Sequence, residues 1–341
     1  MRRQEGDDSA PEAPLLEITR LRTAFSTPHG QLLAVDDVSL ALDAGRVLGL
    51  AGESGCGKSV LALSILGLLP RPAGHVVGGS VRFDGIDLTS LPQRRLADIR
   101  GRRIGMVFQD PMTALSPTLT VGAQIVDSLR RHLGLGRAAA ERRAVELLEE
   151  VRIPRARERV EQYVHEFSGG MRQRAMIAIA IACGPDLLIA DEPTTALDVT
   201  VQAEILDLLD ELRTAHSTAM IMITHDMSVL ADLADHIAVM YAGQIVERAP
   251  AREIFRRAEH PYTEALLGAL PQLDATDARR GRLLAIPGQP PDLIAPPNGC
   301  RFAPRCVWSH LDDGCAEEPL ELHELRPGHW VRTRHPRSVR S

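Results

Sequence analysis

Lysine is almost absent from this chain of 341 residues: of its 39 basic side chains, 38 are arginine and one is lysine. Aromatic residues are also scarce, at 3% of the sequence, so a core must be built mainly from leucine, isoleucine, valine and alanine. The best apolar stretch, Ala175 to Cys183, falls well short of the roughly 20 residues that a helix needs to cross a bilayer. The shortness of the apolar stretches excludes a membrane-spanning helix, and we expect a globular, soluble chain.

Net charge and cysteine content limit the partners and the compartment. The formal net charge of −6 argues against bulk electrostatic capture of nucleic acid, so we expect no nucleic-acid partner. Five cysteines, an odd number, fit a reducing compartment better than a disulfide framework. Residues 1–14 are polar and lack the apolar segment of a signal peptide, so we expect a disordered tail on a cytosolic chain.

Strand-like and helix-like segments alternate after this tail, which is typical of an α/β fold with a mostly parallel sheet. Apolar runs predict strands at 46–51, 81–83, 104–108, 187–190 and 220–223, and a hairpin at 237–246. Periodicity predicts helices at 59–69, from 171 onward and at 201–212, and a helical insertion at about 111–184. We therefore expect an α/β domain with an antiparallel β part over residues 15–258, followed by a small appendage at 259–341.

The lone lysine, Lys58, lies in the run Gly-Glu-Ser-Gly-Cys-Gly-Lys-Ser, between a predicted strand and a predicted helix. This is the pattern of a phosphate-binding loop. Glycines allow backbone N–H groups and the helix N-terminus to approach phosphates closely. We expect Lys58 to reach the β- and γ-phosphates and the Ser59 hydroxyl to bind Mg²⁺. A glycine-rich turn without function is disfavoured, because a strand and a helix flank the motif.

Two adjacent carboxylates, Asp191 and Glu192, follow the apolar run 187–190. At the end of a strand beside a phosphate loop, the first can hold Mg²⁺ and the second can polarise an attacking water. Acid pairs alone are weak evidence, since solvated pairs are common. Combined with the phosphate loop, the pair predicts a magnesium–nucleotide site.

Further segments carry a resemblance to a known family. Phe167 to Arg174, which reads Phe-Ser-Gly-Gly-Met-Arg-Gln-Arg, resembles the signature sequence of ABC-transporter ATPase subunits. Gln109 matches the Q-loop of that family, residues 196–198 its D-loop and His225 its switch histidine. Met171 departs from the commonest signature and is similar to the form found in peptide importers.

The resemblance implies a P-loop NTPase fold of the ABC type and gives each matched residue a role. It implies that Glu192, His225 and Gln109 serve catalysis, and that Gln109 and Asp191 join Ser59 at Mg²⁺. Without the resemblance, the signature would be interpreted as an ordinary helix cap and His225 as structural. The implied ATP-binding residues are Phe25 (stacking on adenine), Gly52, Ser54, Gly55, Cys56, Gly57, Lys58, Ser59, Val60, Ser168, Gly169, Gly170 and Asp198.

The C-terminal region resembles the tail of ATP-binding subunits in oligopeptide, dipeptide and nickel importers. The similar segments are His-Pro-Tyr-Thr-Glu-Ala-Leu-Leu from residue 260, Ile-Pro-Gly-Gln-Pro-Pro from 286 and Gly-Cys-Arg-Phe-Ala-Pro-Arg-Cys at 299–306. The resemblance implies an ATPase that powers uptake of oligopeptides or dipeptides, with nickel or another small solute as the alternative. A soluble ABC ATPase acting on nucleic acid or ribosomes is disfavoured, because the chain has one cassette and a short insertion.

The same resemblance implies partners and a location. Hydrolysis in this family requires two ATPase subunits, identical or related, arranged head to tail with two ATP between them. Two membrane permease subunits and, indirectly, a solute-binding protein complete the expected assembly. The chain is then peripheral, at the cytoplasmic face of the cell membrane.

Three cysteines, Cys300, Cys306 and Cys315, form a cluster in the appendage. Some members of the resembling branch have a fourth cysteine and hold an iron–sulfur cluster, whereas Thr333 stands near that position here. Three thiolates could hold a 4Fe–4S cluster or Zn²⁺ if His329, His335 or another group completed the set. The alternative is a loop that keeps these cysteines without a metal.

Lys58→Arg preserves the net charge but should abolish ATP-dependent activity. The site requires a compact ammonium between backbone amides and two phosphates, where a planar guanidinium is too wide. ATP binding and phosphate release by the purified variant measure this. Activity close to that of the parent chain would show that the site demands only a positive charge.

Overall fold

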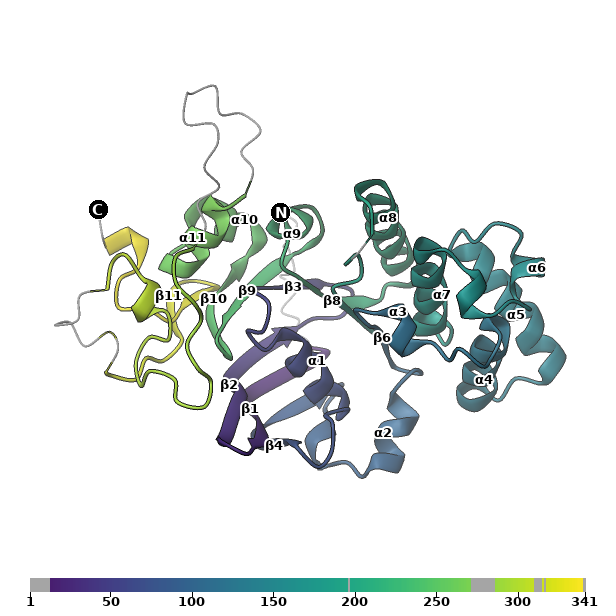
Figure 1. The fold of residues 1–341 in the computed structure, drawn as a ribbon, viewed down its shortest axis with the longest axis horizontal. Coiled ribbons are helices and arrows are strands. Elements are labelled where there is room, and N and C mark those ends of the chain that lie inside the picture. The colour runs from purple at the N-terminus through teal and green to yellow at the C-terminus, as the bar shows by residue number, and fades with distance from the viewer. Residues whose placement is uncertain (1–12, 196, 271–285, 310–314, 316, 340–341) are drawn as a thin grey trace, which may run out of the picture.

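Two β-sheets form the centre of the structure, a computed structural model that describes residues 13–195, 197–270, 286–309, 315 and 317–339 (Figure 1). All but two residues of the predicted disordered tail lie outside these ranges. The larger sheet has eight strands in the described part of the chain, in the order β11-β12-β10-β9-β3-β8-β7-β6. Its strands are β3 (Val47–Ala51), β6 (Ile104–Val107), β7 (Leu187–Asp191), β8 (Ala219–Thr224), β9 (His236–Tyr241), β10 (Gln244–Pro250), β11 (His323–Arg326) and β12 (His329–Val331).

Five neighbouring strands of this sheet, β6, β7, β8, β3 and β9, run parallel. Every residue of β3, β7 and β8 is buried, which agrees with their continuous apolar sequences and with cover on both faces. The carboxyl ends of these strands lie at one edge. Asp191 at the end of β7 pairs with Ile223, which pairs on its other side with Leu50 of β3. The phosphate loop and the two carboxylates therefore meet at this edge.

A second, antiparallel sheet lies against the first, in the order β2-β1-β4-β5. Its strands are β1 (Leu16–Thr27), β2 (Gly30–Leu42), β4 (Gly74–Phe83) and β5 (Ile86–Asp87). Helix α1 (Lys58–Leu66) packs between the two sheets and buries Leu61 and Ile65. The helix ends earlier than the predicted residue 69, because Gly67 takes a left-handed conformation and caps its carboxyl end.

The helices of residues 111–181 form a bundle to one side of the larger sheet, in the segment where a helical insertion was expected (Figure 1). It contains α3 (Pro111–Ala114), α4 (Val121–Leu133), α5 (Arg137–Glu150), α6 (Ala156–Arg159) and α7 (Gly169–Ile181). The other helices are α2 (Gln93–Ile99), α8 (Val199–His216), α9 (Met227–Leu233), α10 (Ala251–Arg257) and α11 (Pro261–Gly268). None of the helices in the described ranges is long and apolar enough to span a membrane.

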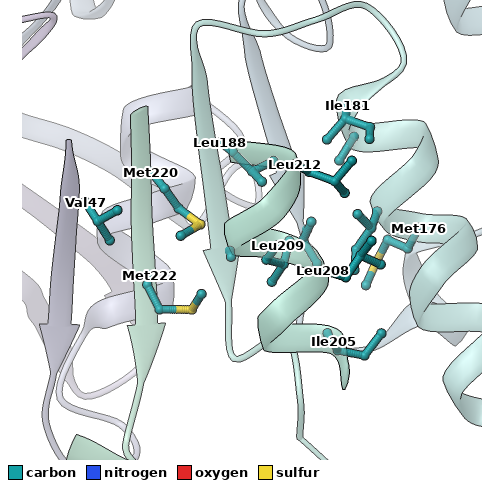
Figure 2. Close-up of a cluster of buried hydrophobic side chains, with 14 of the residues drawn as sticks. Val47, Met176, Ile181, Leu188, Ile205, Leu208, Leu209, Leu212, Met220 and Met222 are labelled. Carbon is teal, nitrogen blue, oxygen red and sulfur yellow. The ribbon is translucent and has the colours of Figure 1, made fainter. Parts of the chain in front are cut away.

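Aliphatic side chains connect the helices to the sheet, as the scarcity of aromatics predicts. Figure 2 shows α8 between the strands and α7, with Leu208 and Leu209 among Met176, Leu188 and Met222. The labelled leucine and methionine side chains are all almost inaccessible to solvent. This packing fixes α7 and α8, and with them the signature segment and residue Asp198, relative to the sheet.

The C-terminal region continues the larger sheet. Strand β12 pairs antiparallel with β10 through Glu247 and Val331, and β11 pairs with β12. Periodicity did not indicate these two short strands, which the sequence placed in an irregular appendage. The expected strands at 46–51, 104–108, 187–190 and 220–223 and the hairpin at 237–246 are confirmed as β3, β6, β7, β8 and the β9–β10 pair.

Candidate nucleotide-binding site

The phosphate loop connects β3 to α1 and wraps around its own lysine. Lys58 is only 4% exposed, and its Nζ donates to the carbonyl oxygens of Gly52 at 2.7 Å and Glu53 at 3.0 Å. Gly52 and Gly57 have φ values of +150° and +109°. A Cβ would lie 2.2 Å from the Met240 carbonyl oxygen at the first position and 2.2 Å from that of Ala34 at the second. The loop therefore requires glycine at both positions.

The amino end of α1 is open to an anion. Gly57 occupies the N-cap and provides no side-chain cap, and the first turn contains no acidic residue. The first N–H groups of a helix lack intrahelical acceptors and carry a partial positive charge. With the ammonium of Lys58 beside them, these donors can bind phosphate oxygens.

Asp191 provides a carboxylate that can bind a cation at the site. Its carboxylate accepts a hydrogen bond from the Ser59 side chain, and burial raises the pKa of Asp191 despite this bond and the nearby Lys58. The atom Oδ1 is buried and has no hydrogen-bond partner among the described residues. A buried carboxylate oxygen without a partner, next to a hydroxyl group, fits a hard divalent cation.

The side chain of Glu192 lies close to both Gln109 and His225. Its Oε2 accepts hydrogen bonds from Gln109 Nε2 at 3.2 Å and from Thr195 Oγ1 at 3.0 Å, and it lies 3.5 Å from His225 Nδ1. Glu192 is mostly buried, at 13% side-chain exposure, whereas His225 is 64% exposed. The backbone of Glu192 is left-handed, with φ of +46°, a conformation that is costly for a non-glycine residue and common at functional sites.

The signature and D-loop residues cap two helices. Ser168 is the N-cap of α7 and accepts from the Met171 N–H at 3.4 Å, while Asp198 is the N-cap of α8 and accepts from the Val201 N–H at 3.1 Å. A Cβ at Gly170 would lie 2.9 Å from a methyl of Val201, so the two helix ends are packed together. Ala196 lies outside the described residues.

Comparison with known sequences identifies the family. Residues 35–195 match the ABC transporter family, and residues 246–315 match the family described as oligopeptide/dipeptide transporter, C-terminal region. The oligopeptide transport ATP-binding protein OppD of Salmonella typhimurium is 48% identical over 326 residues, which cover 94% of this chain and 95% of the relative. OppD of Bacillus subtilis is 48% identical over 319 residues, covering 94% and 88%.

This chain is an ATP-binding subunit of the ABC transporter family, in the oligopeptide/dipeptide branch. Among solved structures, the dimeric post-hydrolysis state of the ATP-binding cassette MJ0796 bound to ADP and Pi is similar, with a TM-score of 0.62 and 27% identity. The match covers 70% of this chain and 99% of that one. The ABC-type P-loop NTPase fold is thereby confirmed, as are ATP and Mg²⁺ as ligands and ATP hydrolysis coupled to transport as the activity.

Phe25, the expected adenine-stacking residue of this ABC subunit, lies on β1 of the antiparallel sheet. It pairs with Leu32 of β2 and with Gly74 of β4, and its ring covers Gly74. Two residues beyond Leu32, the Ala34 carbonyl contacts the loop at Gly57. The ring is half-buried on β1, which lies between β2 and β4, and its role with adenine stays a prediction.

The three cysteines of the C-terminal region line one pocket, together with Thr333 and His335. Burial raises the pKa of the Cys300 thiol to about 11. His329 is engaged elsewhere, because its Nε2 lies 2.7 Å from the buried carboxylate of Glu247. No group of three His, Cys, Asp or Glu side chains within the described ranges is arranged to hold a metal ion, so the expected iron–sulfur or zinc centre stays a prediction.

Sequence reasoning missed a set of contacts beneath the phosphate loop. Glu53, at a variable position of the loop motif, binds Tyr262 of α11 and Arg305 of the C-terminal region. Tyr241, Tyr262 and Phe302 form an aromatic cluster there, with ring centroids 4.5 to 5.4 Å apart. The scarcity of aromatics could have drawn attention to these rings, but no local pattern connects them to the loop.

Gly57→Ala should weaken ATP binding by at least about tenfold, because its Cβ would collide with the Ala34 carbonyl and move the amino end of α1. Gly55→Ala is the matched control: its φ is +78°, yet nothing lies within 4 Å of its Cβ, so it incurs only the left-handed backbone cost of roughly 1–2 kcal/mol. Calorimetric titration with Mg–ATP measures both. Equal losses in the two variants would show that close contact is not what demands Gly57.

Proposed function

We propose that Glu192 is the residue that activates water when this subunit hydrolyses ATP to power import of oligopeptides or dipeptides. The observation that carries the proposal is the position of Glu192. It follows Asp191 directly at the carboxyl edge of the sheet, and its carboxylate lies within reach of both Gln109 and His225. Chain segments far apart in sequence thus converge on one acid beside the phosphate loop.

Each residue has a role that follows from its chemistry. Lys58 and the N–H groups of α1 bind the β- and γ-phosphates, while Ser59 and Asp191 hold Mg²⁺. Bound Mg²⁺ neutralises phosphate charge. Glu192 accepts a proton from the attacking water, and His225, being exposed, is free to approach the γ-phosphate. Gln109, between Glu192 and the helical insertion, senses the occupied site.

A second ATPase subunit completes the site. Ser168 caps one N–H group of α7, that of Met171, and the other N–H groups of the first turn can bind an anion. In the proposed head-to-tail pair, the signature residues 168–170 of one subunit meet the ATP held by the other, with Asp198 at the contact. The similar cassette MJ0796 is dimeric with ADP and Pi, which supports this arrangement.

An ABC ATPase of a peptide importer works with membrane permease partners. We propose two permease subunits docked beside Gln109 and the helical insertion, so that the ATPase is peripheral at the cytoplasmic face. A solute-binding protein would deliver the cargo to the permeases. The C-terminal match over residues 246–315 favours peptide over nickel or another small solute. It also disfavours a soluble ATPase acting on nucleic acid or ribosomes.

Glu192→Gln should preserve ATP binding and lower hydrolysis by at least about 100-fold, because the amide cannot accept the proton of the water. The variant should also accumulate as an ATP-bound dimer. Phosphate release and size-exclusion chromatography with Mg–ATP measure the two effects. Glu211→Gln, at an exposed glutamate on α8, is the control and should hydrolyse ATP normally. Normal turnover by the Glu192 variant would assign the proton acceptor elsewhere.

The cysteine pocket is a second candidate site, because three soft sulfur ligands line one cavity. Within the described residues they are not arranged around a metal ion, so binding would require them to move closer together. Cys300, Cys306 and Cys315 would hold a 4Fe–4S cluster or Zn²⁺, which would displace their protons. Iron, sulfide and zinc analysis of anaerobically purified protein should find one of these metals, and Cys300→Ser should lose it. Protein that contains neither iron nor zinc would establish a metal-free loop.

A further inference from the structure

Arg305 connects the C-terminal region to the phosphate loop. It ends the short 3-10 helix η3 (Ala303–Arg305), and its side chain is only 5% exposed. The guanidinium binds the carboxylate of Glu53 through two bonds, from Nη1 at 2.8 Å and from Nη2 at 3.0 Å. A bidentate pair of this kind fixes both direction and distance.

The remaining donors of this guanidinium are also satisfied. Nη1 donates to the Tyr241 hydroxyl at 3.2 Å, Nη2 to the Ile286 carbonyl at 3.2 Å and Nε to the Pro287 carbonyl at 2.8 Å. Arginine has five N–H donors, and each has an acceptor here. The charge also lies 5.8 Å and 5.9 Å from the ring centroids of Tyr241 and Phe302. The guanidinium therefore has one well-determined orientation.

Glu53 is held from its backbone as well. Its N–H donates to the hydroxyl of the fully buried Tyr262 at 2.8 Å, and its carbonyl accepts from Lys58 Nζ at 3.0 Å. Burial raises the pKa of Tyr262, so this hydroxyl stays neutral at any physiological pH. Glu53 thus connects Lys58 to Tyr262 of α11 and to Arg305 of η3.

The sign of the charge on Glu53 matters in a loop that receives a triphosphate. An unpaired carboxylate there would repel the anion and weaken its binding. We propose that Arg305 is a positioning residue for the phosphate loop, which holds and neutralises Glu53 and so allows the C-terminal region to set the affinity for ATP. This inference rests on the proposed ATP site.

Arg305→Met in the full chain should raise the Kd for Mg–AMPPNP, a non-hydrolysable ATP analogue, by at least about tenfold. The KM for ATP should rise with it while kcat at saturating ATP stays within about twofold, because Arg305 does not touch the reacting atoms. Arg332→Met is the matched control. Arg332 is 6% exposed and also fixes the C-terminal region, but to Asp37 of β2 rather than to the loop, so its Kd should not change.

A rescue experiment separates this role from general loss of stability. Glu53→Gln added to Arg305→Met removes the unpaired carboxylate and should recover most of the lost affinity, although the bidentate contact is still absent. If the single variant does not fold, the milder Arg305→Lys keeps the charge but loses the fork, and it should raise the Kd less than tenfold but measurably. Circular dichroism and thermal unfolding of each variant monitor the fold.

The outcomes are distinct. An unchanged Kd in folded Arg305→Met or Arg305→Lys would overturn the inference, as would equal weakening in Arg305→Met and Arg332→Met. A double variant that binds no better than Arg305→Met would refute the neutralising role. Failure of the parent chain itself to bind Mg–AMPPNP would instead refute the proposed ATP site.

Discussion

The phosphate loop depends on close contact between its backbone and the strands around it. The carbonyls of Met240 and Ala34 approach Gly52 and Gly57 so closely that no side chain fits at either position. Lys58 is buried in the loop and bonded to two of its carbonyls, as a buried ammonium must be to offset lost hydration. The loop, its lysine and the surrounding β9 and β2 strands therefore form one interdependent unit.

The C-terminal region contacts this unit through Arg305, which binds Glu53 of the loop. Three buried arginines, Arg301, Arg305 and Arg332, attach it to the rest of the chain through acidic residues and backbone carbonyls. A planar guanidinium group with several N–H donors suits such desolvated contacts better than an ammonium group does. The arginine-rich composition thus has a structural use at these positions, while the one lysine lies where a compact charge is needed. The turn of the β9–β10 hairpin completes the enclosure, since the Gly243 N–H donates to the Cys56 carbonyl.

Much of the fold could be predicted because its signals are local. Continuous apolar runs gave β3, β7 and β8, and helical spacing gave α8. The phosphate loop and the carboxylate pair were recognisable because their residues are adjacent in sequence. Strands β11 and β12 could not be found in this way, since they are three to four residues long and become strands only by pairing with β10. Contacts of Phe25 with Gly74, and of Glu192 with Gln109 and His225, likewise depend on how the strands are ordered.

The amino-acid order alone establishes which chemical groups this protein has and how they are grouped along the chain: the loop, the two carboxylates, the signature segment and the cysteines. Only folding brings Glu53 to Arg305, which lies 252 residues away, and pairs His329 with Glu247 rather than placing it at the cysteine pocket. Local patterns reflect the periodicity of helices and strands, which a few neighbouring residues establish. A contact between distant residues forms only when the whole sheet is assembled, because its energy must offset the entropy of closing a long loop.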